Sequence, residues 1–305
     1  MDNSIAIIRY TKSDFIAKNI EFNGFTVINA YKSSNYVSYL IWKTLKLLNL
    51  PGQSLWYNGK LKHTCFDTII LIESNLTVHF VNWIRKNNPN SRIVFWYWNI
   101  VENTINPSRI KDDSIEKWSF SEKDCEIYSM QYNPPFYFKN IKIEQSKEEY
   151  DLYFAGKDKG RLSALLDFKK KSEELGLNVY LHVSPTRKLD LIFNSKNLKP
   201  AISYDRVLED VAKSKALLDI IEVTDSGQSQ RTMESIFFEK KIVTNSKLIK
   251  KFDFYNQENI FVIGEDNIEK LPSFLKTPYV KIDENIINRY EVRNWVKRFL
   301  INQVI

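Results

Sequence analysis

Short apolar strands alternate with helices through the first half of the sequence. The clearest strand is FDTIILIES (66–74), whose uninterrupted apolar run is typical of a strand buried on both faces of a parallel sheet. A helix with apolar residues at helical spacing is expected at 76–86, and the strand RIVFWYW follows at 92–98. Two further short strands are expected at 4–10 and 25–31. This order and spacing predict a parallel sheet with crossover helices.

The alternation stops at KNIKIEQSKEE (139–149), a polar, charged segment without apolar periodicity, and then starts again. We therefore predict an α/β protein of two Rossmann-like lobes that face each other across a cleft, covering residues 1–145 and 146–283. A last helix, within residues 284–305, is expected to pack back toward the first lobe. The expected strands of the second lobe lie at 150–156, 178–183, 216–222, 241–245 and 259–264, with helices at 162–175 and 203–214.

Composition narrows the class of protein. The chain has 305 residues, enough for two domains, and it has no apolar run of 18 residues and no N-terminal secretory signal pattern. Cys65 and Cys125 lack metal-type spacing, and His63, His79 and His182 are far apart in the sequence, so we expect a reducing, cytoplasmic location and no zinc site. The net charge of +7 favours anionic partners such as nucleotide phosphates or an anionic membrane surface. Nucleic acid is not expected, because no zinc-finger spacing or RNA-binding sheet motif is visible.

The segment GKDKGR (156–161) follows the first strand of the second lobe. Its glycines allow close approach of a ligand to the backbone, and its three cations stand at a helix N-terminus, which favours anions such as a diphosphate. A solvated turn with charges flanking a helix is the alternative. Because ligands of open parallel sheets bind beyond the carboxyl ends of the strands, His182 after the next strand is also a candidate. The candidate donor-binding residues of this part are Gly156, Lys157, Lys159, Arg161 and His182.

A second polar stretch, SGQSQRTMES (226–235), leads into an apolar helix. Its small residues can present backbone N–H groups to phosphate, Arg231 can add a charge-assisted contact, and Glu234 can accept two hydrogen bonds from a ribose diol. The alternative for Glu234 is that it complements the dipole of its own helix. The candidate donor-binding residues here are Ser226, Gly227, Gln228, Arg231, Thr232 and Glu234.

Three segments carry a resemblance: FAGKDKGR, QSQRTMESIFFEKKIVTN and FYNQENIFVIG, together with WYWN (96–99) and EKWSFSEKDCEIY (116–128) in the first half. The sequence resembles bacterial GT-B-type glycosyltransferases of capsule, exopolysaccharide and lipopolysaccharide gene clusters. The resemblance implies a nucleotide-sugar donor lobe at 146–283 and an acceptor lobe at 1–145. It also implies a nucleoside-diphosphate sugar as co-substrate, with a UDP-sugar favoured, and no other cofactor. The family pattern has a small residue pair after the glutamate and a glycine before the next strand, where this chain has Ser235 and Lys240.

Metal-dependent transferases of another fold hold a divalent ion with a D-x-D motif, and no such triplet occurs in this sequence. We therefore expect metal-independent catalysis, with cations neutralising the leaving diphosphate. An inverting transfer needs a base from the first lobe, and Glu73 and Asp14 lie at expected strand ends. Each has an alternative as an ordinary polar loop residue. The sequence leaves open whether the reaction is inverting or retaining.

The segment YVSYLIWKTLKLLNL (36–50) predicts an apolar helix containing two lysines. It is either a buried helix of the first lobe or a helix that rests on an anionic membrane, which would suit a lipid-linked or oligosaccharide acceptor. Two other functions stay open beside the transferase: a two-lobed sugar- or nucleotide-binding protein without turnover, and a nucleotide-sugar epimerase.

Overall fold

The computed structural model describes residues 4–10, 14–32, 35–62, 65–73, 76–144, 146–187, 196–221 and 227–301. The chain forms two compact units: unit 1 comprises residues 1–134 and 295–305, and unit 2 comprises residues 135–294. The chain therefore passes from unit 1 to unit 2 between residues 134 and 135, before the polar segment 139–149 at which the boundary was expected. The reason is apolar burial, because Tyr137 and Phe138 are fully buried and fall within unit 2.

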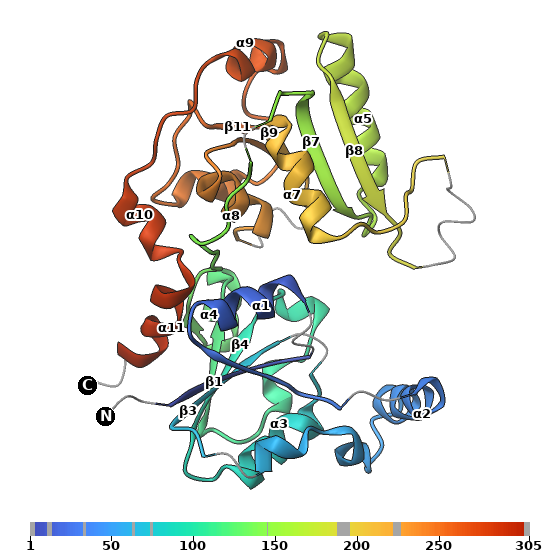
Figure 1. Cartoon of the computed structure of the whole chain (residues 1–305), viewed down its shortest axis with the longest axis vertical. Helices are drawn as coiled ribbons and strands as arrows, with labels where there is room; N and C mark the ends of the chain where they lie inside the picture. The colour runs from blue at the N-terminus through green and yellow to red at the C-terminus, as the bar shows by residue number, and fades with distance from the viewer. Residues whose placement is uncertain are drawn as a thin grey trace. The chain divides into compact units, whose positions relative to one another are not determined.

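Unit 1 is built on a parallel sheet with strand order β2-β1-β3-β4-β5-β6 (Figure 1). The pairing of Ile7 with Ile70, and of Ile70 with Val94, places three fully buried apolar residues side by side across its centre. Its strands are β1 (Ile5–Arg9), β2 (Thr26–Asn29), β3 (Thr68–Ile72), β4 (Arg92–Tyr97), β5 (Ile115–Ser119) and β6 (Gln131–Tyr132). Its helices include α1 (Phe15–Phe22), α2 (Tyr36–Leu47), α3 (Val78–Asn87) and α4 (Glu122–Tyr128).

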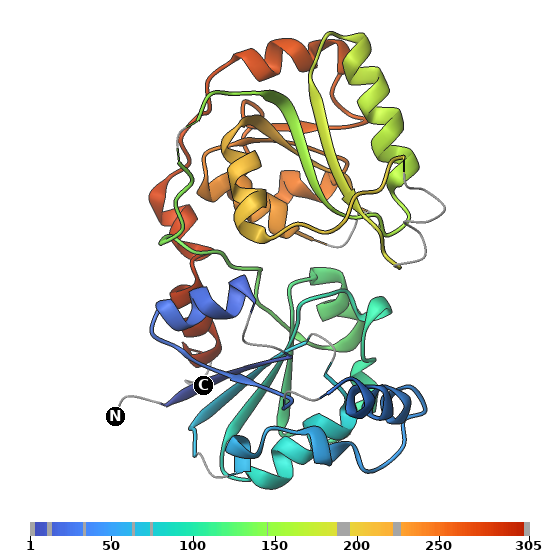
Figure 2. The same cartoon turned by 45° about the vertical axis from the view of Figure 1, so that its right-hand side comes forward.

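Helices cover both faces of this sheet. Phe80, Val81 and Ile84 of α3 pack into a core cluster with strand residues such as Ile69 and Phe95. On the other face lie α1 and the C-terminal helix (Figures 1 and 2). The sheet therefore has the doubly covered arrangement that an uninterrupted apolar strand requires.

Unit 2 repeats the architecture with five parallel strands in the order β11-β10-β9-β7-β8. The side chains of α5 and α9 pack on one face, where Phe154, Leu165 and Leu271 belong to one buried cluster. The strands are β7 (Tyr150–Lys157), β8 (Val179–Ser184), β9 (Ser214–Asp219), β10 (Lys241–Thr244) and β11 (Ile260–Val262). The helices include α5 (Leu162–Glu174), α7 (Tyr204–Ala212), α8 (Gln230–Phe237), α9 (Leu271–Lys276) and α10 (Glu284–Arg289).

The C-terminal helical region is two helices rather than the single one expected. α10 ends at Arg289 and α11 runs over Val292–Ile301. The break has a long-range cause: the Tyr137 N–H donates to Tyr290 O at 2.8 Å, and the Val292 N–H donates to Tyr137 O at 3.0 Å. These backbone groups bond to another segment instead of continuing the helix.

Within unit 1, α11 packs on the sheet through aromatic rings. The Trp295 ring lies 5.0 Å from that of Trp96, and the Phe299 ring lies 5.0 Å from that of Trp118. Short 3₁₀ helices lie at Gln53–Trp56, Gly59–Lys62, Val101–Asn103, Pro107–Arg109, Lys247–Lys251 and Ile268–Lys270. In the described part of the chain, no helix combines the length and apolarity needed to cross a membrane.

Candidate functional site

The carboxyl ends of the unit 2 strands meet at one edge of the sheet, since all five run parallel. β7 and β9 are neighbours near the middle of the order, and the segment GKDKGR (156–161) begins at the end of β7. Open α/β sheets bind their ligands at such an edge. The candidate site is therefore assembled from the ends of β7 and β9 and from the start of α8.

Asp219 ends β9 and is 2% exposed, so its charge needs partners. Arg231 Nη1 lies 3.1 Å from its Oδ1, and the Ser229 hydroxyl donates to its Oδ2 at 2.6 Å. Ser229 is also the N-cap of α8, because its Oγ accepts from the Thr232 N–H at 3.1 Å. The start of α8 is thus fastened to the end of β9 by a charged pair and a capping hydroxyl.

Gly156 brings the two basic motifs together. A Cβ added there would stand 3.2 Å from Nη2 of Arg161 and 3.2 Å from Nη2 of Arg231. Both guanidinium groups also lie over the Phe154 ring, with Cζ 4.9 Å and 4.5 Å from its centroid. Glycine is required here for close approach, and two cations from segments far apart in the sequence converge on one point of the sheet edge.

Both arginines also hold backbone. Arg161 Nη1 donates to Ile220 O at 2.7 Å and Nη2 donates to Lys157 O at 3.0 Å, while Arg231 Nη2 donates to Ala155 O. These bonds tie the end of β7 to the segment after β9. The two arginines therefore fix the backbone at the carboxyl edge of the sheet and also give that edge positive charge.

Lys157 and Lys159 are exposed at this edge. Lys159 and Gly160 both have positive φ, at 49° and 86°, and the Arg161 N–H donates to Asp158 O at 3.0 Å. Positive φ at both central residues defines a type I′ turn, which places the Lys159 side chain at the turn. Asp158 Oδ1 accepts from the Leu162 N–H at 2.8 Å, so one N–H at the start of α5 already has a partner.

Glu234 is buried, with 5% of its surface exposed, and lies in the second turn of α8. The Tyr204 hydroxyl donates to its Oε1, and the Tyr137 and Tyr204 hydroxyl oxygens are 2.6 Å apart. Burial raises the pKa of Glu234 above its ordinary value, whereas Arg231 and the Tyr204 hydroxyl lower it and Asp219 raises it further. Burial also raises the pKa of Tyr204, followed by the effect of Glu234. Tyr204, itself bonded to Tyr137, therefore orients the Glu234 carboxyl group, and burial disfavours the charged form of that group.

Glu234→Gln is expected to stabilise the protein at neutral pH. A carboxyl whose folded pKa is raised contributes its full stability below its unfolded pKa and loses that contribution as pH rises through the folded value. The advantage of glutamine should therefore grow as pH rises from about 4.5 upward. Thermal melts of both proteins between pH 5 and 8 measure it. An advantage that is constant over this range would show that the carboxyl does not titrate as described.

The remaining candidate residues of unit 2 differ in their burial and in their hydrogen-bond partners. His182 is buried and its Nε2 lies 2.8 Å from Pro200 O, so its ring is engaged by the backbone. Thr232 is buried beneath the cap of α8. Gly227 has φ 93°, a conformation that favours glycine. Gln228 is 4% exposed, and its two amide atoms have no hydrogen-bond partner among the described residues. Ser226 lies outside the described residues.

In unit 1, Asp14 has a structural role. Its Oδ1 accepts from the Ala17 N–H at 2.7 Å, capping α1, and its Oδ2 accepts from Arg9 Nη2 at 2.8 Å. Arg9 is itself buried and lies over the Trp98 ring. Both oxygens of Asp14 are thus engaged, which disfavours it as a proton acceptor.

Glu73 follows β3 and is 5% exposed. The Asn99 amide donates to its Oε2 at 2.9 Å. Burial lowers the pKa of Lys46, and Glu73 acts in the opposite direction on that group. Burial raises the pKa of Tyr97, and the charge of Glu73 raises it further. Glu73 is thus a buried carboxyl at the carboxyl edge of the unit 1 sheet, where a ligand of an open sheet would lie.

Sequence patterns missed several residues of the site. Asp219 ends the apolar strand ALLD, and an acid at a buried strand end was a signal that could have found it. Tyr137, Tyr204 and Phe154 carry no such signal, because each reaches the site only through tertiary contacts.

A pocket of about 230 Å³ in unit 2 lies away from this edge. It is lined by the C-terminal part of α8, including Ile236 and Phe237, and by Lys139 and Lys281. Neither Arg231 nor Glu234 lines this pocket, so it is not the candidate site. Among the described residues, no group of three or more histidine, cysteine, aspartate or glutamate side chains is arranged to hold a metal ion.

Each of the two α/β units is built on a parallel sheet, and these two units match the fold of GT-B glycosyltransferases. The lipopolysaccharide outer core galactosyltransferase WaaB in its apo form shares this fold, with a TM-score of 0.51 at 13% identity over 97% of this chain and 98% of that one. A DNA-modifying β-glucosyltransferase, solved with and without uridine diphosphoglucose, gives 0.54 at 13% identity over the same shares of the two chains.

Sucrose-phosphate synthase from Thermosynechococcus elongatus gives a TM-score of 0.54 at 9% identity over 98% of both chains. No protein-family model matches the sequence, and no curated protein matches it. The fold predicted from the sequence is therefore confirmed: this chain has the fold of GT-B glycosyltransferases.

Proposed function

We propose that this chain is a glycosyltransferase that moves a hexose from a nucleoside-diphosphate sugar to a saccharide acceptor in bacterial surface polysaccharide synthesis. The observation that carries the proposal is the convergence of Arg161 and Arg231 on Gly156, at the carboxyl edge of the unit 2 sheet. A glycine between two cations suits a diphosphate, because the cations balance its negative charge and the glycine lets the backbone approach its oxygens closely. The names of the similar structures support a galactose-type sugar and a UDP-linked donor.

Each residue has a role in this proposal. Lys157 and Lys159, exposed beside the converging arginines, neutralise the diphosphate as it leaves, which removes the need for a metal ion. Glu234 accepts hydrogen bonds from the ribose hydroxyls, and Tyr204 fixes its orientation. The acceptor oxygen bonds to the anomeric carbon as the bond from that carbon to the diphosphate breaks, and the electron pair leaves with the diphosphate.

The acceptor hydroxyl must lose its proton. For an inverting reaction we assign the base to Glu73 rather than Asp14, because hydrogen bonds engage both oxygens of Asp14. The acceptor is proposed to be lipid-linked or an oligosaccharide, with the protein at the inner face of the cytoplasmic membrane.

The test is release of nucleoside diphosphate from a panel of nucleotide sugars, with and without saccharide acceptors and with excess chelator. We expect one donor to release its nucleoside diphosphate faster with an acceptor, at a rate that the chelator leaves unchanged. Loss of turnover that manganese or magnesium restores would contradict metal independence. Interconversion of the donor would identify an epimerase, and binding without turnover would identify a binding protein.

A further inference from the structure

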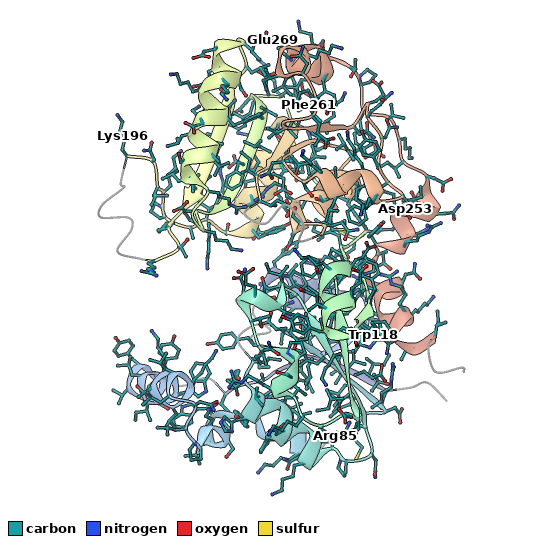
Figure 3. All side chains as sticks on the ribbon, turned by 180° about the vertical axis from the view of Figure 1, so that it is seen from behind. Arg85, Trp118, Lys196, Asp253, Phe261 and Glu269 are labelled. Carbon is teal, nitrogen blue, oxygen red and sulfur yellow. The ribbon has the colours of Figure 1, made fainter. Side chains whose placement is uncertain are left out.

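The solvent-facing side of α2 is apolar, the reverse of an ordinary surface helix. Trp42 is its buried residue. On the side that faces solvent, Val37, Ile41 and Leu48 follow helical spacing, and these residues are 66%, 51% and 59% exposed. Leu47 beside them is 81% exposed. Figure 3 shows side chains standing out from this helix into open space.

The apolar surface continues past the helix. Leu50 and Leu55 are 41% and 72% exposed in the segment that follows. Most of the exposed large apolar side chains of the described residues therefore belong to one stretch, 36–55. Scattered exposed leucines need no explanation, but a contiguous patch marks an interaction surface. We call residues 36–55 the α2 patch.

The charge around the α2 patch has one sign. From Phe22 to Phe66 the sequence contains five lysines and no aspartate, glutamate or arginine. Four of these lysines, Lys32, Lys43, Lys60 and Lys62, are exposed. A segment of 45 residues thus carries five positive charges, against a net +7 for the whole chain.

We propose that the α2 patch binds the surface of an anionic lipid bilayer. Apolar side chains of an interfacial helix enter the boundary between headgroups and acyl chains, and flanking lysines meet the anionic headgroups. Long lysine side chains can reach the headgroups while their stems follow the apolar surface. A second copy of the chain is a poor occupant, because the symmetric contact would set five positive charges against five more. The proposal does not rest on transferase activity.

Vesicle co-sedimentation of the full chain, without nucleotide sugar, tests the proposal. The protein should bind vesicles of phosphatidylglycerol and phosphatidylcholine at low salt, and bind pure phosphatidylcholine vesicles at least tenfold more weakly. Leu40→Gln with Leu47→Gln should reduce binding about tenfold or more, because two apolar side chains no longer enter the interface. Lys43→Gln with Lys60→Gln should reduce it similarly, by removing two headgroup contacts.

The matched controls are Ile127→Gln, which changes a side chain 59% exposed on α4, and Lys276→Gln at the end of α9. Both should bind as the wild type does, and thermal melts should show every variant folded. Absence of binding to anionic vesicles, or equal binding by the α2 variants and the wild type, would overturn the proposal. So would a dimer in light scattering that Leu40→Gln with Leu47→Gln dissociates while vesicle binding is absent.

Discussion

Arg231→Ala is expected to lower the free energy of unfolding by about 3 kcal/mol, the lower end of the cost of breaking a buried ion pair. The variant leaves Asp219, which is 2% exposed, without its charged partner. The Ser229 hydroxyl still donates to Asp219, and this bond keeps the loss at the lower end of the range. Urea unfolding followed by circular dichroism measures the change.

Arg289→Ala is the matched control, because the Arg289 side chain is 63% exposed and pairs with Asp253 at the surface. That pair should contribute about 1 kcal/mol or less. Equal losses in both variants would show that the Arg231–Asp219 pair does not fasten α8 to the sheet. Because Arg231 supports the fold, any effect of its removal on nucleotide binding must be measured on the folded variant.

Most strands could be predicted because each depends on a local apolar run. The expected strand at 66–74 contains β3, and that at 92–98 contains β4. β5 (Ile115–Ser119) was not predicted, since Glu116 and Lys117 interrupt its apolar pattern. The structure explains the acid: Arg92 Nε on β4 lies 2.5 Å from Glu116 Oε1. A charge that is satisfied by a neighbouring strand is invisible in a single sequence.

The C-terminal region shows a second limit. The periodicity from residue 284 onward gives no sign of a break, because the break is made by backbone bonds to Tyr137. The segment at 36–50 shows a third limit. Its pattern predicted a helix, but only the structure shows that its apolar side faces solvent.

Part of the arrangement of the candidate site depends on local signals for the same reason. Glycines and cations at strand ends are local signals, and the structure brings Gly156, Arg161 and Arg231 together. The partners of these residues are not local. The carboxyl of Asp219 and the hydroxyl of Tyr204 reach α8 through the folding of β9 and α7, which spacing alone does not predict.

Glu234→Ala is expected to weaken the binding of uridine diphosphate by about 1.5–3 kcal/mol, the range for hydrogen bonds to a charged group. This corresponds to roughly a 10- to 150-fold higher dissociation constant. Alanine removes both acceptor oxygens and leaves the Tyr204 hydroxyl without its acceptor on α8. Glu234→Gln should have a milder effect, because one acceptor oxygen remains.

Calorimetric titration of uridine diphosphate into the wild type, Glu234→Ala, Glu234→Gln and Glu269→Ala tests the donor site most directly. Glu269 is an exposed control in unit 2, labelled in Figure 3. We predict one saturable site per chain, weakened strongly by alanine and mildly by glutamine at position 234 and unchanged in Glu269→Ala. Absence of binding to the wild type, or equal affinity in all four proteins, would contradict the assignment of the nucleotide site to unit 2.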